Sequence, residues 1–376
     1  MSKQKSSPRF RFTGAVLLLS ILIFLVPALQ NGSSTLYLLC VLIPCIMLFA
    51  GTLLARMFSL DRMILTLSFW LCTVGIAALA LSDPEAAMAQ SLRCGAGLAA
   101  LLCGSILIRS LSASLLTSVC SAFLGLLLLA GKLLAPAFSL PLTEVALALL
   151  LVSFGTLLTR QGPLSAILCA SAALALLLFR GEPAEALIWG ITILLLLFAV
   201  DGRLVILLPA AAVMAVLFFV AFSLLPAPAV PQENMISALV SAGGLGSDSL
   251  PEAIASLDKV SLFPLVTGHY GLAFSGLTVL LFLPFTLRGT TVASVARSRL
   301  HGMLAMGISL LLSLRALIAL LSLFGFLPFT DIAVPFLTSS LPGLCAELFL
   351  TGLLCGISGR NDADLAEDAH LAMLAQ

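Results

Sequence analysis

Long apolar runs follow one another along almost the whole chain, and this pattern constrains the fold more than any other feature. Only 9% of the 376 residues are charged, whereas soluble domains have about 25%. Most runs approach the ~20 residues that a helix needs to cross the hydrocarbon core of a membrane. The sequence therefore predicts an all-α, polytopic transmembrane helix bundle of about 12 spans. The runs are 14–30, 36–55, 62–82, 93–108, 112–135, 143–159, 162–179, 185–200, 203–226, 271–287, 303–326 and 338–357.

The basic residues are distributed unequally between the two ends of these runs. If the N-terminus lies inside, thirteen of the eighteen Lys and Arg residues fall at inner ends, four fall at outer ends, and Arg315 lies within a span. Positive residues favour the cytoplasmic face. We therefore expect a multi-pass membrane protein with both termini in the cytoplasm.

Several classes of protein and site are disfavoured by the polar residues. The chain has no basic run and no zinc-finger pattern, which argues against nucleic-acid binding. The nine cysteines lie inside apolar runs without a C-x-x-C pair, so we interpret them as packing residues. The three histidines are too scattered to suggest a metal site.

One connection is much longer than the others. Residues 227–270 form a predicted outer loop that starts with several prolines, contains Gly243 and Gly244, and is too apolar to be disordered. Loops of this length inside compact domains are usually functional or disordered. A structured, apolar outer loop suits a protein that works on a lipid.

Motifs along the chain resemble those of the SEDS proteins (shape, elongation, division and sporulation), such as FtsW, RodA and SpoVE. Residues 315–341 resemble the C-terminal pattern Q-A-F-x-N-x-x-x-x-x-G-x-x-P-x-T-G-x-x-x-P-F-x-S-Y-G-G, and Gly243-Gly244 lies in a stretch like S-G-G-L-x-G. Thr143-Glu144 resembles P-S-E-x-A-K, Glu182-Pro183 resembles Q/E-P-D-x-G, and Asp61-Arg62 resembles the start of the family's first transmembrane helix.

The resemblance divides the chain into three parts. Residues 59–360 correspond to the SEDS transmembrane domain of ten helices. Residues 1–58 hold a basic start and two additional N-terminal transmembrane helices. Residues 361–376 form an acidic cytoplasmic tail, which we expect to be a loose amphipathic end.

The resemblance implies a peptidoglycan glycosyltransferase of the bacterial plasma membrane that polymerises lipid II at the outer leaflet for division, elongation or sporulation. Its partners would be lipid II or another undecaprenyl-linked glycan, and a bitopic penicillin-binding transpeptidase. A loop carboxylate would deprotonate the acceptor hydroxyl; no cofactor is implied except a divalent cation that can steady the leaving diphosphate. The rival interpretation is a non-catalytic scaffold that binds lipid II or a cell-wall synthesis partner. A lipid flippase or transporter is the third class.

The chain departs from the family pattern at polar positions. Aligning Gly271 with the final Gly of the family's E-E-x-G places Val260 where the family has its essential Asp, and Asp258 is the nearest carboxylate. Asp258 and Lys259 are either a displaced catalytic pair or a solvated loop pair. His269 is either a titrating group at the headgroup level or a plain interfacial residue.

Arg315 and Glu347 are the charged residues expected deep in the membrane. An unpaired charge there is costly, and the depths of the two residues in neighbouring antiparallel spans agree within about one helical turn. We predict that they are in contact, either as a structural ion pair or as part of a site that binds a diphosphate or sugar. Glu144 and Glu185 begin spans, where a carboxylate stabilises the helix N-terminus, and we interpret both as helix caps.

Overall fold

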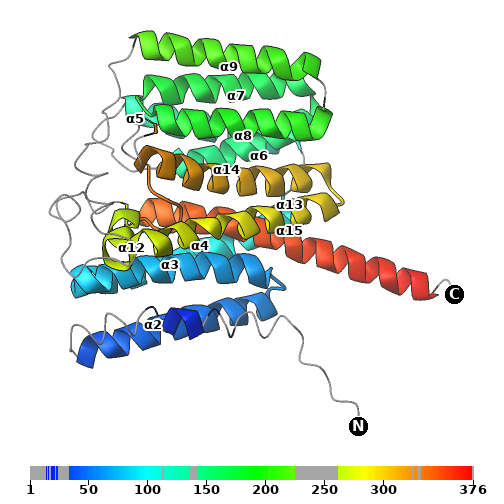
Figure 1. The fold of residues 1–376 in the computed structure, drawn as a ribbon. Coiled ribbons are helices and arrows are strands. Elements are labelled where there is room, and N and C mark those ends of the chain that lie inside the picture. The colour runs from blue at the N-terminus through cyan, green and yellow to red at the C-terminus, as the bar shows by residue number, and fades with distance from the viewer. Residues whose placement is uncertain are drawn as a thin grey trace.

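The computed structural model is a bundle of long helices that lie side by side (Figure 1). It describes residues 34–111, 114–134, 143–202, 204–224, 261–323, 326–327 and 332–374, and seven positions between 14 and 23. The predicted first span and most of the predicted outer loop lie outside these residues. The helices are α2 (Ser34–Met57), α3 (Arg62–Ser82), α4 (Pro84–Ser110), α5 (Leu115–Leu134), α6 (Thr143–Arg160), α7 (Pro163–Phe179), α8 (Pro183–Asp201), α9 (Leu204–Leu224), α12 (Phe263–Leu280), α13 (Phe282–Val295), α14 (Arg299–Leu323) and α15 (Leu341–Leu374).

Length and composition confirm the all-α membrane class. Among the described residues, seven helical segments are long and apolar enough to cross a membrane, and four shorter apolar helices accompany them. Most of the helices follow the predicted runs closely. The exact number of twelve spans stays a prediction, because the first run is largely outside the described residues.

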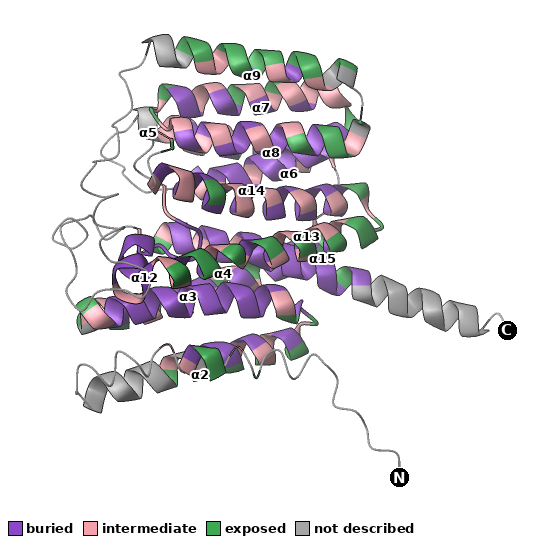
Figure 2. Cartoon of the chain, viewed as in Figure 1, coloured by how far each residue is buried: buried purple, intermediate pink, exposed green. Residues whose placement is uncertain are grey.

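Helix α3 is the most enclosed of the seven long apolar segments, with 94% of its most hydrophobic stretch buried. Asp61 caps it by accepting hydrogen bonds from the backbone N–H groups of Met63 and Ile64. The same carboxylate accepts from Arg288 of α13 at 2.7 Å, which ties the start of α3 to a distant helix. In Figure 2, α2 and α9 at opposite edges of the bundle carry more exposed residues than α3.

Helices α4 and α15 approach each other closely because small residues line their contact. A Cβ on Gly352 would lie 2.8 Å from the backbone carbon of Leu101, and one on Gly356 would lie 2.8 Å from the carbonyl oxygen of Ser105. Glycine at these positions lets the two backbones pack without intervening side chains.

The structure corrects four boundaries. Helix α4 begins at Pro84, nine residues before the predicted run 93–108. The end of the expected outer loop is helical: α12 begins at Phe263 and kinks at Gly271, whose φ of 82° favours glycine. Helix α13 continues to Val295, so the connection to α14 is shorter than the apolar runs predict. The acidic tail, expected to be loose, continues α15 as helix to Leu374 and projects beyond the bundle (Figure 1).

Candidate functional site

Arg315 is the centre of a buried cluster of charged side chains. Arg315 is only 5% exposed and lies on α14, eight residues before the last residue of that helix, Leu323. Nη2 of Arg315 donates to Oε1 of Glu144 at 2.9 Å and also to Oε1 of Glu185. These carboxylates stand in the first turns of α6 and α8. One guanidinium therefore joins three helices inside the bundle.

Glu347 of α15 is the third carboxylate of this cluster. Its Oε1 lies 3.9 Å from Nη1 of Arg315, and its Oε2 accepts a hydrogen bond of 2.7 Å from the backbone N–H of Phe336. Phe336 is fully buried and has a φ of 66°, which is uncommon for a residue other than glycine. Glu347 thus stabilises an unfavourable backbone conformation while facing the guanidinium.

The extended segment 332–340, which contains Phe336, connects the cluster to the end of the predicted outer loop. The backbone N–H of Leu262 donates to the carbonyl of Leu337 at 2.8 Å, and Ser261 and Thr338 form an isolated antiparallel bridge. The side chain of Gln90 donates to the carbonyl of Thr338 at 2.8 Å. These hydrogen bonds therefore hold segment 332–340 against the start of α12 through Leu262 and against α4 through Gln90.

A second ion pair lies beside the cluster, at the start of the same helices. Arg180 forms a salt bridge of 2.9 Å with Glu182, directly before α8. Arg180 also donates to the hydroxyl of Thr143 at 3.0 Å, and this hydroxyl donates to Glu182 at 3.2 Å. Because Thr143 precedes Glu144, the pair supports the helix end that carries Glu144.

Three carboxylates surround one guanidinium, so negative groups outnumber positive ones in the cluster. Within the described residues, Oε2 of Glu144 and Nε of Arg315 are buried without a hydrogen-bond partner. Buried polar atoms of this kind normally have a partner. The cluster thus offers one acceptor and one donor for a further polar group, such as a sugar hydroxyl.

The structure brings together some of the residues selected from the sequence. The predicted contact between Arg315 and Glu347 is confirmed at 3.9 Å. His269 instead forms a hydrogen bond of 3.0 Å with Ser82, at the end of α3. Asp258, Lys259, Gly243 and Gly244 lie outside the described residues.

Glu144 and Glu185 are the members of the cluster whose contacts sequence reasoning missed. Both stand in first turns, as a capping role requires, but their side chains reach Arg315. Their partner is 171 and 130 residues away in the chain, respectively. The sequence signal that could have pointed to these contacts was the excess of carboxylates at one predicted end of the spans.

In the described part of the chain, no group of three or more His, Cys, Asp or Glu side chains is arranged to hold a metal ion.

Comparisons with known proteins point to cell-wall synthesis proteins. No family model matches the chain. A stretch of 97 residues, 25% of this chain, is 36% identical to proteins named probable peptidoglycan glycosyltransferase FtsW from two strains of Geobacter sulfurreducens. The chain covers only 26% of the length of those relatives.

A solved structure matches much more of the chain. One chain from a study titled "Structural coordination of polymerization and crosslinking by a peptidoglycan synthase complex" aligns with a TM-score of 0.61 at 18% identity. The alignment covers 80% of this chain and 98% of that chain. The protein is therefore a multi-pass helical membrane protein with the fold of that synthase subunit. Over that stretch of 97 residues, a quarter of the chain, the sequence is a distant homologue of proteins named FtsW.

Proposed function

We propose that this protein is a SEDS-like peptidoglycan glycosyltransferase that acts on lipid II at the outer leaflet of the plasma membrane. The observation that carries the proposal is the position of Glu144. This residue occupies the glutamate of the family-like S-E-x-A stretch, and it lies in the buried polar cluster of a fold that aligns with 98% of a synthase subunit. Its Oε2 has no partner among the described residues, which suits an acceptor for a sugar hydroxyl.

The proposed reaction joins the disaccharide-pentapeptide of one lipid II to a growing glycan and releases undecaprenyl diphosphate. Asp258 is the proposed general base, and its loop ends at Ser261, which pairs with Thr338 close to the cluster. Lys259, His269, Gly243 and Gly244 are proposed to contact the substrate near the membrane surface, and Arg315 and Glu347 to shape the buried end of the site. The orientation with both termini in the cytoplasm belongs to this proposal, since it places Asp258 outside.

A bitopic penicillin-binding transpeptidase is the proposed partner, because the structural relative belongs to a complex that both polymerises and crosslinks peptidoglycan. Residues 59–360 are the proposed catalytic domain. The two N-terminal helices would be an addition, consistent with the 80% coverage of this chain in the alignment.

Purified protein, reconstituted with labelled lipid II and a bitopic penicillin-binding transpeptidase, tests the proposal. Wild type should form glycan polymer, Asp258→Ala should form none, and Glu252→Ala, a carboxylate elsewhere in the same loop, should keep activity. Polymer made equally well by Asp258→Ala would remove Asp258 from the mechanism.

The second candidate is a scaffold that binds lipid II or a synthesis partner without polymerising. The engagement of both Nη atoms of Arg315 by carboxylates favours it, since only Nε of the guanidinium is left for a diphosphate. Binding of lipid II without polymer under the same conditions would support the scaffold. Absence of binding would reject both functions.

A further inference from the structure

Gln90 is a buried polar side chain on the part of α4 that precedes the predicted apolar run, and it is 1% exposed. Its side-chain N–H donates to the backbone carbonyl of Thr338 at 2.8 Å, and its carbonyl oxygen accepts from Nη1 of Arg93 at 3.1 Å. Buried polar groups are normally hydrogen-bonded. An acceptor on one side and a donor on the other allow only one orientation of this amide, so its N–H is directed at Thr338.

The helix that carries Gln90 is a rigid support. Asp83 caps its first turn by accepting hydrogen bonds from two backbone N–H groups, both at 3.1 Å. Further along, α4 packs on α15 without intervening side chains, since a Cβ on Gly104 would lie 3.1 Å from the backbone nitrogen of Leu353. The position of Gln90 is therefore set by the helices around it and does not depend on the predicted outer loop.

Thr338, which Gln90 holds, also contacts the end of that loop. Ser261 forms an antiparallel bridge with Thr338, and the next residue, Leu262, donates its backbone N–H to the carbonyl of Leu337 at 2.8 Å. Leu262 and Leu337 are fully buried, and Thr338 is 3% exposed. Thr338 thus links α4 on one side to the returning end of the loop on the other.

The position of Ser261 limits where the last residues of the loop can lie. Asp258 comes three positions before Ser261 in the sequence. Three residues of extended chain reach at most ~11 Å. A shift of the loop end at Ser261 would therefore move the region that is accessible to the Asp258 carboxylate.

We propose that Gln90 is a positioning residue for the glycosyltransferase reaction. Its amide N–H fixes the carbonyl of Thr338, and this sets where the outer loop meets the bundle and where Asp258 can act. The inference rests on the proposed function, which assigns Asp258 as the base. In this role Gln90 does not need to touch the substrate, so its loss should lower kcat and leave KM nearly unchanged.

Two substitutions separate the hydrogen bond from packing. Gln90→Met has a similar length and no donor, whereas Gln90→Glu keeps the length and has a donor only when its carboxyl group is protonated. At neutral pH, with labelled lipid II and a bitopic penicillin-binding transpeptidase, both should lower kcat by about 10- to 100-fold, the loss expected when a reacting group is misplaced. As the pH falls, the ratio of kcat in Gln90→Glu to kcat in wild type should rise, and the ratio for Gln90→Met should stay low.

Ser91→Ala is the matched control, because the hydroxyl of Ser91 donates to the carbonyl of Met88 in the same helix. It should keep the kcat of wild type. A kcat of Gln90→Met equal to that of wild type would overturn the positioning role. If Gln90→Met does not fold, Gln90→Glu decides alone: recovery of kcat at low pH supports the donor role, and a ratio independent of pH contradicts it.

A second readout needs no activity. Ser261→Cys, with Cys103 and Cys120 replaced by Ser, is labelled with an impermeant maleimide in vesicles. Labelling should be several-fold faster in the Gln90→Met background than in the Ser91→Ala background, because the loop end has lost its support. Equal rates would overturn the anchoring of the loop by Gln90. Wild type that makes no polymer would reject the proposed function and the catalytic role of Gln90 with it, whereas faster labelling in the same protein would still establish the anchor.

Discussion

Glu347 accepts a hydrogen bond of 2.7 Å from the backbone N–H of Phe336 while its other oxygen faces Arg315 at 3.9 Å. The two contacts couple a buried charge cluster to a backbone segment in an unfavourable conformation. Segment 332–340 in turn pairs with Ser261, where the predicted outer loop ends. A substitution of Glu347 should therefore alter the position of the end of the predicted outer loop at Ser261, although Glu347 itself is only 2% exposed.

We expect Glu347→Gln and Glu347→Leu to differ. The amide oxygen of Gln still accepts from Phe336, so only the charge is lost, and the unfolding temperature should fall modestly. Leu leaves a buried N–H unsatisfied, which costs about 1–3 kcal/mol. Thermal unfolding in detergent compares the two, and labelling of Ser261→Cys reports the position of the loop end. Equal effects of both substitutions would contradict the role of the hydrogen bond.

Arg315→Gln should be strongly destabilising, because it leaves the buried carboxylate of Glu347 and the half-buried carboxylates of Glu144 and Glu185 without a cation. Breaking a buried ion pair by removing one partner costs about 3–5 kcal/mol. Arg62→Gln, at an exposed arginine on α3, is the matched control and should change stability by less than about 0.5 kcal/mol. Equilibrium unfolding in mild detergent with increasing denaturant measures both.

The double variant Arg315→Gln with Glu185→Gln tests whether the two residues act on each other. Residues in direct contact have non-additive effects on stability. The loss in the double variant should therefore be smaller than the sum of the two single losses. Strict additivity would mean that the contact between Arg315 and Glu185 contributes nothing.

The contact between α4 and α15 should be sensitive to a single methyl group. Gly352→Ala places a Cβ against the backbone of Leu101, which cannot move aside easily, and should lower the unfolding temperature. Gly95→Ala on α4 meets no atom within 4 Å. It should leave stability unchanged or raise it slightly, since Ala favours helix over Gly by up to about 1 kcal/mol. Similar losses for the two variants would argue against close packing at Gly352.

The proposed orientation can be tested by cysteine labelling from the two sides of the membrane. Ser249 lies in the predicted outer loop, and Ser298 lies between α13 and α14. With Cys103 and Cys120 replaced by Ser, an impermeant maleimide should label Ser249→Cys from outside only and Ser298→Cys from inside only. Labelling of both from the same side would overturn the topology.

The sequence by itself determined the class of protein and most of the helices. Apolar runs are a local property, and a run near the membrane thickness has no alternative to helix, since lipid offers no partner for backbone N–H and C=O groups. For the same reason the unusual charge at position 315 could be recognised as buried and in need of a partner. The depths of Arg315 and Glu347 along their spans were enough to predict one contact of the cluster.

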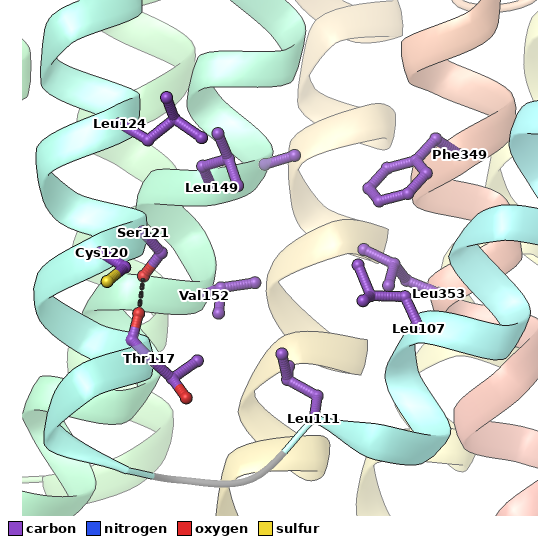
Figure 3. Close-up of a pocket in the computed structure, with 11 residues that line it drawn as sticks. Leu107, Leu111, Thr117, Cys120, Ser121, Leu124, Leu149, Val152, Phe349 and Leu353 are labelled. Atoms are coloured by element: carbon purple, nitrogen blue, oxygen red, sulfur yellow. Dashed lines mark hydrogen bonds between the residues drawn. The ribbon is translucent and has the colours of Figure 1, made fainter.

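The remaining partners were decided only by the tertiary structure. Glu144 and Glu185 resemble ordinary first-turn carboxylates in the sequence, and only the packing of α6 and α8 around α14 directs them at Arg315. The left-handed conformation of Phe336 accompanies a hydrogen bond from its N–H to Glu347, in the next helix, and apolar periodicity does not predict that conformation. The apolar cavity between α4 and α5 (Figure 3) is the clearest case. It exists because α4 packs mainly on α15 and α5 packs mainly on α6, although α4 and α5 follow one another in the chain. Local patterns establish that a helix forms and how long it is, but the choice of neighbours depends on side-chain fit between segments far apart in the chain.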